Sequence, residues 1–167
     1  MMDKYSFKEN CSLDIEKSVA FTGHRELEKD FDYQNLQDFI QDLIEKGYEN
    51  FFIGMAVGFD SVCFKVLESL KKSYQHINLI ACIPCKEQDR NFSYSQKKDY
   101  RKMINNADYK VLISENYTPY CMQERNRFMV DNSSLVVAYM LRHQGGTYNT
   151  VKYAQLKGRK IINIVNK

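Results

Sequence analysis

The chain has 167 residues, of which 44% are apolar and 27% are charged, and its net charge at pH 7 is +3. This length suits one well-buried domain rather than two, and no apolar run approaches the roughly 20 residues of a membrane-spanning helix. Because acidic and basic residues are interspersed, we expect no long-range attraction to a membrane or to nucleic acid, and nucleic acid is not expected as a partner.

Short apolar runs alternate with amphipathic or polar stretches from residue 17 onward. The apolar runs predict strands at 18–21, 50–53, 77–83, 109–113, 135–139 and 160–165. The stretches between them predict helices at 36–44, 59–70, 94–105, 122–132 and 149–157. Gly47 and Gly158 directly follow two of these helices, as helix-ending glycines do. Residues 1–16 precede the pattern and are expected to form an N-terminal arm or tail.

This alternation predicts the fold class. Strands that alternate with helices are joined by right-handed crossovers, which produce a mostly parallel sheet covered on both faces. We therefore expect a single domain over 17–167, a Rossmann-like three-layer α/β/α sandwich with about six strands. In such sheets ligands bind beyond the carboxyl ends of the strands.

Five segments follow predicted strands and should share that edge of the sheet. They are Thr22–Arg25, Gly54–Asp60, Pro84–Asn91, the stretch that ends in Cys121–Asn126, and the turn at Gly145–Gly146. A hydroxyl and a guanidinium in the first segment suit an oxygen-rich anion, although a solvated loop explains the same residues. The segment is thus one candidate among several.

The turn GMAVGFD, residues 54–60, joins a strand to the most amphipathic helix of the chain. Gly54 and Gly58 can let a phosphate or ribose approach the backbone, or they can serve a compact turn in which Asp60 caps the helix. The turn lacks the Lys-Ser/Thr of a P-loop and the third glycine of a dinucleotide fingerprint. The motif alone leaves both readings open.

Arg125 lies inside the apolar stripe of its predicted helix, so its guanidinium needs an anion. Asp60, Asp131 and a ligand phosphate are equally good partners at this stage. The glycines of HQGGTYNT, residues 143–150, stand where a strand leads into a helix. They either allow a tight crossing or expose the helix N-terminus to an anion.

The remaining reactive residue types predict no metal centre and no nucleophile. The three histidines are far apart, no serine or cysteine stands in a nucleophile elbow, and the first cysteine of the CxxC pair Cys82 and Cys85 falls within a predicted strand. Tyr117, Tyr120 and Tyr148 fall in rim loops where a ring can stack on a base. Five scattered cysteines and an N-terminus without a signal-peptide run favour a cytoplasmic protein.

The rim segments together resemble the DUF1273 proteins of the SLOG superfamily, which also holds DNA-processing protein A and the Lonely Guy enzymes. The motifs are TGHR, GMAVGFD, PCKEQ, YTPYCMQERNRFMVD and GGTYNTVKYA, between about residues 19 and 165. The resemblance implies a Rossmann-like fold that binds a nucleotide or nucleotide-derived small molecule, such as ADP-ribose, NAD or a nucleoside phosphate. No cofactor is otherwise implied.

Residue patterns and resemblance together predict one set of ligand-binding residues. They are Thr22, Gly23, His24, Arg25, Gly54, Met55, Ala56, Gly58, Asp60, Pro84, Arg125, Asn126, Gly145, Gly146, Thr147 and Thr150.

The sequence departs from the Lonely Guy pattern where catalysis is concerned. Their GGxGTxxE loop requires a glutamate, and residues 145–154 contain no carboxylate. Lys65 and Phe92 also stand where related proteins tend to carry glutamate and tryptophan. The departures favour a non-catalytic sensor or adaptor with a small anionic ligand.

Two alternatives to the sensor remain. The first is a hydrolase or transferase at an N-glycosidic or phosphate bond, with Asp60, Asp131 or Glu124 as acid or base. The second is single-stranded DNA binding, by analogy with the DNA-processing relatives. A homo-oligomer is compatible with all three functions.

Overall fold

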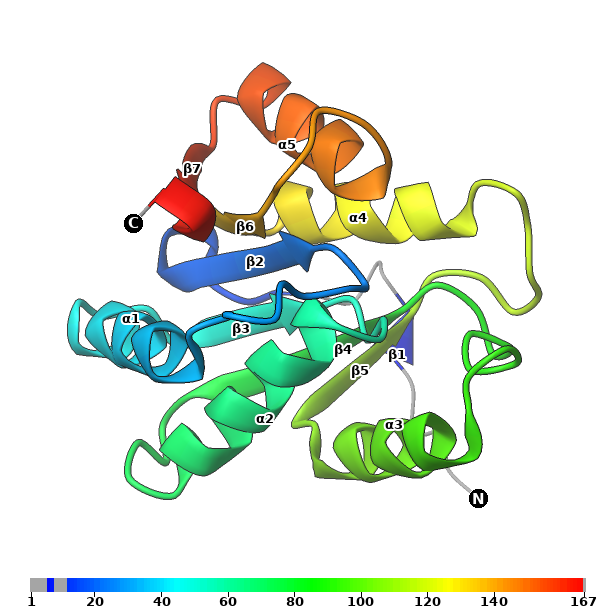
Figure 1. Cartoon of the computed structure of the whole chain (residues 1–167), viewed down its shortest axis with the longest axis horizontal. Helices are drawn as coiled ribbons and strands as arrows, with labels where there is room; N and C mark the ends of the chain where they lie inside the picture. Colours follow the sequence, from blue (N-terminus) through cyan, green and yellow to red (C-terminus); the bar gives the residue numbers. More distant parts are fainter. Residues whose placement is uncertain (1–5, 8–11, 167) are drawn as a thin grey trace.

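The structure is a computed structural model that describes residues 6–7 and 12–166 (Figure 1). The strands are β1 (Ser6–Phe7), β2 (Ser18–Gly23), β3 (Asn50–Ile53), β4 (Asn78–Ile83), β5 (Tyr109–Leu112), β6 (Leu135–Tyr139) and β7 (Lys160–Asn163). The helices are α1 (Tyr33–Glu45), α2 (Phe59–Lys71), α3 (Tyr94–Asn106), α4 (Cys121–Asp131) and α5 (Gly146–Leu156). Short 3-10 turns at Ile15–Lys17 and Ile164–Asn166 flank this core.

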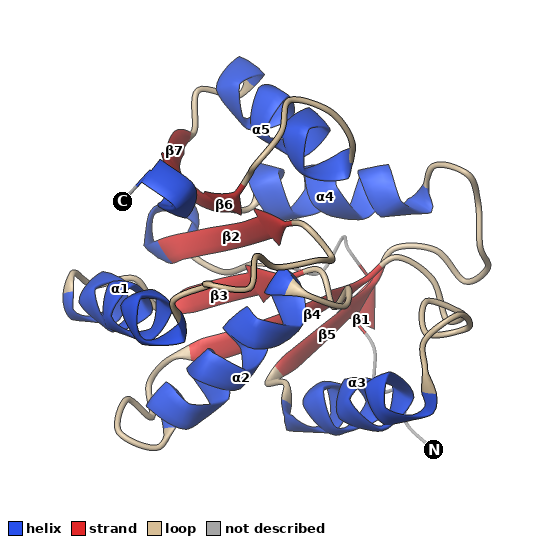
Figure 2. Cartoon of the chain, in the orientation of Figure 1, coloured by secondary structure: helices blue, strands red, loops and turns tan. Residues whose placement is uncertain are grey.

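The strands form one sheet in the order β1-β5-β4-β3-β2-β6-β7, and every strand pairing in the described residues is parallel. Helices α1, α2 and α3 cover one face and α4 and α5 cover the other (Figure 2). The predicted Rossmann-like three-layer sandwich is therefore confirmed, and each predicted strand and helix has its counterpart. The additional strand β1 lies within the segment expected to be an arm and pairs with β5.

Local sequence explains where the helices begin and which face each one buries. Asp32 caps α1, because its carboxylate accepts the backbone N–H of Asn35 at 2.9 Å. Helix α3 begins with a capping box in which Ser93 and Gln96 exchange side-chain and backbone hydrogen bonds. The apolar stripe of α2, with Phe59 at its start, is buried against the sheet. The hydrophobic pattern thus fixes both the helices and their inward faces.

The order of strands places a crevice at the middle of the sheet. From β2 the chain moves through β3 and β4 to β5 on one side, and then returns to β6 on the other side of β2. The loops after β2 and β6 consequently leave the sheet toward opposite faces, which opens a space beyond their carboxyl ends. This is the expected place for a ligand.

Two further predictions meet the structure at this level. No helix within the described residues has the length and apolar character needed to cross a membrane, and the cytoplasmic location stays a prediction. The described cysteines are all buried thiols without disulfides: Cys63, Cys82, Cys85 and Cys121. Cys11 lies outside the described residues.

Candidate functional site

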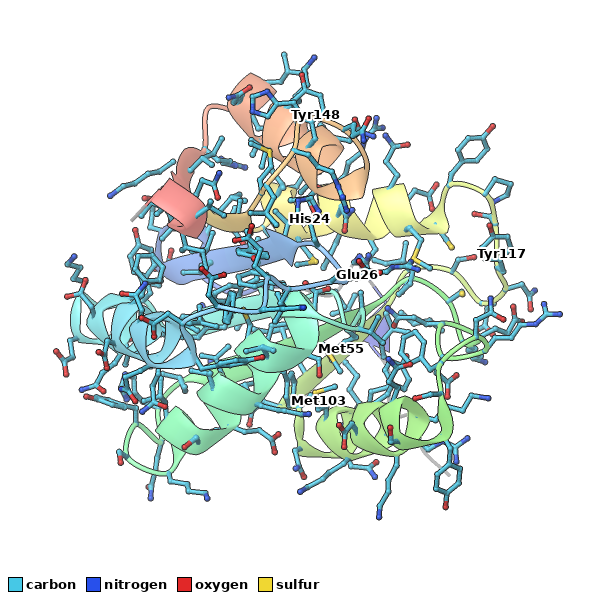
Figure 3. All side chains as sticks on the ribbon, viewed as in Figure 1. His24, Glu26, Met55, Met103, Tyr117 and Tyr148 are labelled. Carbon is cyan, nitrogen blue, oxygen red and sulfur yellow. The ribbon has the colours of Figure 1, made fainter. Side chains whose placement is uncertain are left out.

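A cleft of about 520 Å³ opens at the crevice beside β2. We call it the rim cleft. The predicted residues that line it are Thr22, Gly23, His24, Arg25, Ala56, Asp60, Arg125, Asn126, Gly145, Gly146 and Thr147. His24 and Glu26 lie together near the centre of the molecule, where the β2 segment meets α4 and α5 (Figure 3). Segments far apart in sequence thus converge on one space.

The other predicted residues lie outside the rim cleft. Gly54 and Gly58 belong to the adjoining turn, and Met55 is 1% exposed and lines a smaller pocket beside α3. Pro84 is buried, and its carbonyl accepts the backbone N–H of Ser114 at 3.1 Å. Thr150 lines a neighbouring groove and donates its hydroxyl to the Gly146 carbonyl at 2.8 Å.

His24 lies at the edge of the rim cleft and forms hydrogen bonds with the start of α2 and with the loop after β6. Its backbone carbonyl accepts the N–H of Phe59 at 3.1 Å, and its Nε2 accepts the N–H of Leu141 at 2.9 Å. Burial and, second, the nearby Arg142 guanidinium lower the pKa of His24, so the ring is neutral and Nε2 stays an acceptor. The residue holds the site together and contributes no positive charge to it.

Gly58 is required by the packing of the loops. Its φ is +85°, and a Cβ at this position would stand 2.2 Å from the backbone oxygen of Arg25. The loop after β2 therefore covers Gly58 directly, and the glycine serves loop contact rather than a ligand. Gly23 is packed as tightly, because a Cβ there would meet the Phe59 ring at 2.4 Å.

Asp60 lies in the first turn of α2 and is 6% exposed. Its Oδ2 accepts the backbone N–H of Ala56 at 3.2 Å. Burial raises the pKa of Asp60 to about 6, against the lowering effects of Arg125, the Ala56 N–H and Arg25. Asp60 also lines the rim cleft.

Arg125 is 6% exposed and forms the floor of the rim cleft. Its Nη1 donates to the Gly54 carbonyl, and its Nε donates to Asn126 Oδ1 at 2.8 Å. The same Gly54 oxygen accepts Gln88 Nε2 at 2.9 Å, and Tyr100 donates its hydroxyl to Gln88 at 3.0 Å. A buried chain of hydrogen bonds thus connects the guanidinium to α3.

Of the three partners considered for Arg125, the structure removes one. Asp131 accepts the Tyr153 hydroxyl at 2.8 Å, lies 3.8 Å from Lys157 Nζ, and does not line the rim cleft. Asp60 acts on Arg125 at longer range, since no carboxylate of the described residues forms an ion pair with its guanidinium. Burial lowers the pKa of Arg125 and Asp60 opposes this. The arginine faces the cleft without a paired carboxylate.

The two glycines of the HQGGTYNT turn have different reasons to be glycine. Gly145 has a φ of +88°, which a side chain would strain, and it precedes α5 without providing a side-chain cap. Gly146 begins the helix, and apart from its chain neighbours and the backbone of α5 no heavy atom of the described residues lies within 4 Å of the place where its Cβ would stand. Close packing therefore does not explain Gly146.

Five residues that were not predicted line the rim cleft as well: Phe21, Glu26, Met122, Arg142 and Gln144. For three of them the sequence holds a weak signal, because Arg142 and Gln144 shortly precede the glycine pair and Met122 precedes Arg125 by one helical turn.

None of the three rim tyrosines lines the cleft. Tyr117 lies in the β5–α4 loop, well away from His24 and Glu26 (Figure 3). The Tyr148 ring stacks on His143 with centroids 5.6 Å apart and has Lys152 Nζ 5.4 Å from its centroid. Its ring already has neighbours, so base stacking at these tyrosines has no support from their placement.

The parallel sheet, with the rim cleft where the loops after β2 and β6 diverge, places the protein in the general class of Rossmann-like proteins. Comparison with known sequences identifies the family. The model of the YspA SLOG family matches residues 20–163. The chain belongs to the YspA SLOG family, which confirms the SLOG resemblance read from the rim motifs.

The names of two similar proteins state no activity. The SPbeta prophage-derived protein YoqJ of Bacillus subtilis is 35% identical over 129 residues, which cover 70% of this chain and 75% of the relative. A UPF0398 protein of Lysinibacillus sphaericus is 26% identical over 113 residues, covering 66% of this chain and 63% of the relative.

Two solved structures share the fold. DNA processing protein A of Streptococcus pneumoniae superposes with a TM-score of 0.65 at 20% identity, covering 86% of this chain. This chain spans about half of that protein, 48% of its length. DNA processing protein A of Helicobacter pylori, described as having a single-stranded DNA binding mode, gives a TM-score of 0.65 at 16% identity over 86% of this chain and 63% of that one.

These likenesses correct one prediction. The net charge of +3 led us to expect no nucleic-acid partner, but a protein with this fold is described as binding single-stranded DNA. Net charge averages over the whole surface, whereas at the rim cleft three arginines, Arg25, Arg125 and Arg142, outnumber the carboxyl groups of Asp60 and Glu26. A small net charge therefore does not exclude a nucleic-acid partner for this chain.

Proposed function

We propose that the chain binds a nucleotide or nucleotide-derived small molecule, such as ADP-ribose, NAD or a nucleoside phosphate, with its phosphate in the rim cleft. The main support is Arg125, which is 6% exposed, lines the cleft and has no ion pair with a carboxylate of the described residues. A buried guanidinium is costly without an anion, and a ligand phosphate supplies one. The chain acts as a sensor or adaptor for this ligand.

The first turn of α5 gives the phosphate a second contact. The N–H groups that begin a helix lack intrahelical partners and carry the positive end of its dipole. At α5 this end has no side-chain cap, and Gly146 leaves the backbone open toward the cleft. Arg142 and Arg25 add positive charge from the exposed side of the cleft. The phosphate is held by backbone and side chains together.

Asp60 suits the sugar of such a ligand. The residue lines the cleft, and its Oδ2 accepts the Ala56 N–H at 3.2 Å. A carboxylate oxygen accepts a hydrogen bond from a ribose hydroxyl, and a protonated carboxyl donates one instead. The ligand therefore orients with its phosphate toward α5 and its sugar toward α2.

Calorimetric titration tests the proposal with adenosine 5′-monophosphate, ADP-ribose and NAD, and with adenosine as the ligand that lacks phosphate. We expect binding of at least one phosphate-bearing ligand and none of adenosine, because the phosphate makes the charge-assisted contacts. The absence of heat and of a thermal shift with all three phosphate-bearing ligands would contradict the proposal.

Two variants locate the binding to the cleft. Gly146→Ala adds one methyl group where the empty protein has room, so it removes phosphate access without disturbing the fold. We expect affinity to fall by about tenfold or more, the value of one lost charge-assisted hydrogen bond. Arg101→Ala on α3 removes an exposed positive charge outside the cleft and serves as the control. Equal losses in the two variants would show that the effect is general electrostatics.

Single-stranded DNA binding is a second candidate, and the single-stranded DNA binding mode of the Helicobacter pylori protein favours it. The sugar-phosphate backbone of a strand offers the same phosphate chemistry to Arg125 and α5. This candidate predicts an affinity that falls steeply as salt increases, in proportion to the number of phosphates contacted. A mononucleotide that competes fully with the strand would assign both to the rim cleft.

A hydrolase remains the alternative to binding without turnover, and it has one carboxyl in position. Of the three residues considered, Asp60 lines the cleft, whereas Glu124 and Asp131 do not. Overnight incubation with nucleoside monophosphates, followed by chromatography, measures any released base. We expect no released base. Base release by the wild type that is lost in Asp60→Asn would show that the protein is an enzyme and would contradict the sensor proposal.

A further inference from the structure

A second hollow adjoins the rim cleft between α4 and α5. It measures about 510 Å³, and we call it the α4–α5 groove. Met122, Asn126 and Gly146 line both the groove and the rim cleft. The two hollows therefore meet at the start of α5, where no heavy atom of the described residues outside the α5 backbone and the chain neighbours lies within 4 Å of the Cβ position at Gly146.

The charged side chains that line the groove are all cations. Arg127 and Lys152 line it, and no carboxylate of the described residues does, whereas the rim cleft combines three arginines with Asp60 and Glu26. On α4, residues two positions apart project to opposite sides of the helix, so the same helix presents Arg125 to the cleft and Arg127 to the groove. The groove therefore carries the more uniform positive charge.

Both groove cations are held by aromatic rings rather than by acids. The Arg127 guanidinium lies 5.3 Å from the centroid of Tyr153, and Lys152 Nζ lies 5.4 Å from that of Tyr148. Asp131 is the carboxylate at this end of α4, and it is engaged by Tyr153 and Lys157 instead. A ring fixes a cation in place while leaving its N–H groups able to donate.

This chemistry selects an anion over a nucleobase as the occupant. The Tyr153 ring has Arg127 and Lys157 over it, at 5.3 and 5.7 Å from its centroid, which disfavours a stacked base. Two cations that contact aromatic rings and no carboxylate suit a phosphate far better than a base. A mononucleotide seated in the rim cleft would fill one hollow and leave these cations unused.

We propose that the α4–α5 groove binds a second phosphate, so that the preferred ligand is a nucleotide in which a sugar separates two phosphate groups. This inference rests on the proposed phosphate site in the rim cleft. The ligand passes over Gly146, with one phosphate beside Arg125 and the other between Arg127 and Lys152. Such a unit occurs both in small nucleotides and in single strands.

The test compares adenosine 5′-monophosphate with adenosine 3′,5′-bisphosphate by calorimetry on the full chain. Wild type is expected to bind the bisphosphate about tenfold more tightly, as one additional charge-assisted contact gives. Arg127→Ala is expected to remove this preference and to leave the affinity for the monophosphate unchanged. Lys152→Gln tests the same preference from α5, and Arg101→Ala is the control that keeps it.

The outcomes separate the two proposals. If neither ligand binds wild type, the rim-cleft site fails and the groove inference fails with it. If both bind equally and Arg127→Ala and Lys152→Gln change nothing, the groove inference fails while the rim-cleft proposal stands. A dinucleotide and a longer oligonucleotide then identify the source: equal affinity points to a small molecule, and tighter binding of the longer strand points to nucleic acid.

Discussion

The burial of Asp60 predicts a stability that depends on pH in an unusual direction. The folded protein raises the pKa of this carboxyl from an ordinary value of 3.8 to about 6, chiefly by burial. The folded state therefore binds the proton more tightly than the unfolded chain does. The stabilisation is fully present below about pH 4 and is lost as pH rises through about 6. Most surface carboxylates that gain a partner on folding behave in the opposite way.

The size of the effect follows from the two pKa values. One pKa unit corresponds to about 1.4 kcal/mol, so the change between 3.8 and about 6 amounts to about 3 kcal/mol of unfolding free energy. Asp60→Asn removes the titration and keeps an oxygen that can accept the Ala56 N–H. The stability of the variant relative to wild type should increase by this amount between acid and neutral pH.

Urea unfolding of wild type and Asp60→Asn at about pH 4 and about pH 8 measures this difference, and other titrating groups cancel in the comparison. Asp38→Asn, which removes an exposed carboxylate from α1, controls for the loss of one negative charge. A difference between wild type and Asp60→Asn that is the same at both pH values would refute the reasoning. It would mean that Arg125 fully compensates the burial of the ionised carboxylate.

Three further substitutions test the loops by urea or thermal unfolding. Gly58→Ala should destabilise by at least about 2 kcal/mol, because its Cβ meets the Arg25 oxygen at 2.2 Å and its φ is positive; a neutral effect would place the loop elsewhere. Gly146→Ala should instead stabilise by up to about 1 kcal/mol, since it adds no contact and favours the helix; a marked loss would show that Gly146 is packed. Ser93→Ala should cost about 1 kcal/mol through the lost capping box, and Ser95→Ala, which removes only a 3.4 Å contact with the Ser93 hydroxyl, should cost less.

The order of strands and helices was predictable because the spacing of apolar residues along the sequence distinguishes the two. Continuous apolar runs such as 18–21 and 135–139 are typical of strands buried on both faces. The apolar stripe from Phe59 to Leu70 repeats at helical spacing. Strand β1 was not predictable, because two residues carry no period and the pairing with β5 is long-range. The start of α5 at Gly146 rather than near 149 was missed because the first turn has no apolar stripe.

The convergence of four of the five rim segments was also predictable, since parallel strands end at one edge and each segment follows a strand; the fifth, Pro84–Asn91, does not line the rim cleft. What the sequence could not supply was the choice of partner for Arg125. A backbone carbonyl, that of Gly54, accepts its Nη1, and no side-chain pattern marks such an acceptor. Glu26 and Arg142 were missed for a related reason: exposed loop residues have no periodicity, and only the folded loops bring them to the cleft.

The Gly54 carbonyl gives the molecule a connection through the thickness of its sheet. One oxygen accepts Arg125 from the α4 layer and Gln88 from the segment that leads to α3, and Gln88 in turn accepts Tyr100. Any event that draws the guanidinium toward a guest shifts electron density and geometry at an acceptor shared with the opposite layer. The position of the guanidinium is thereby linked by hydrogen bonds to Tyr100, in the layer on the other face of the sheet.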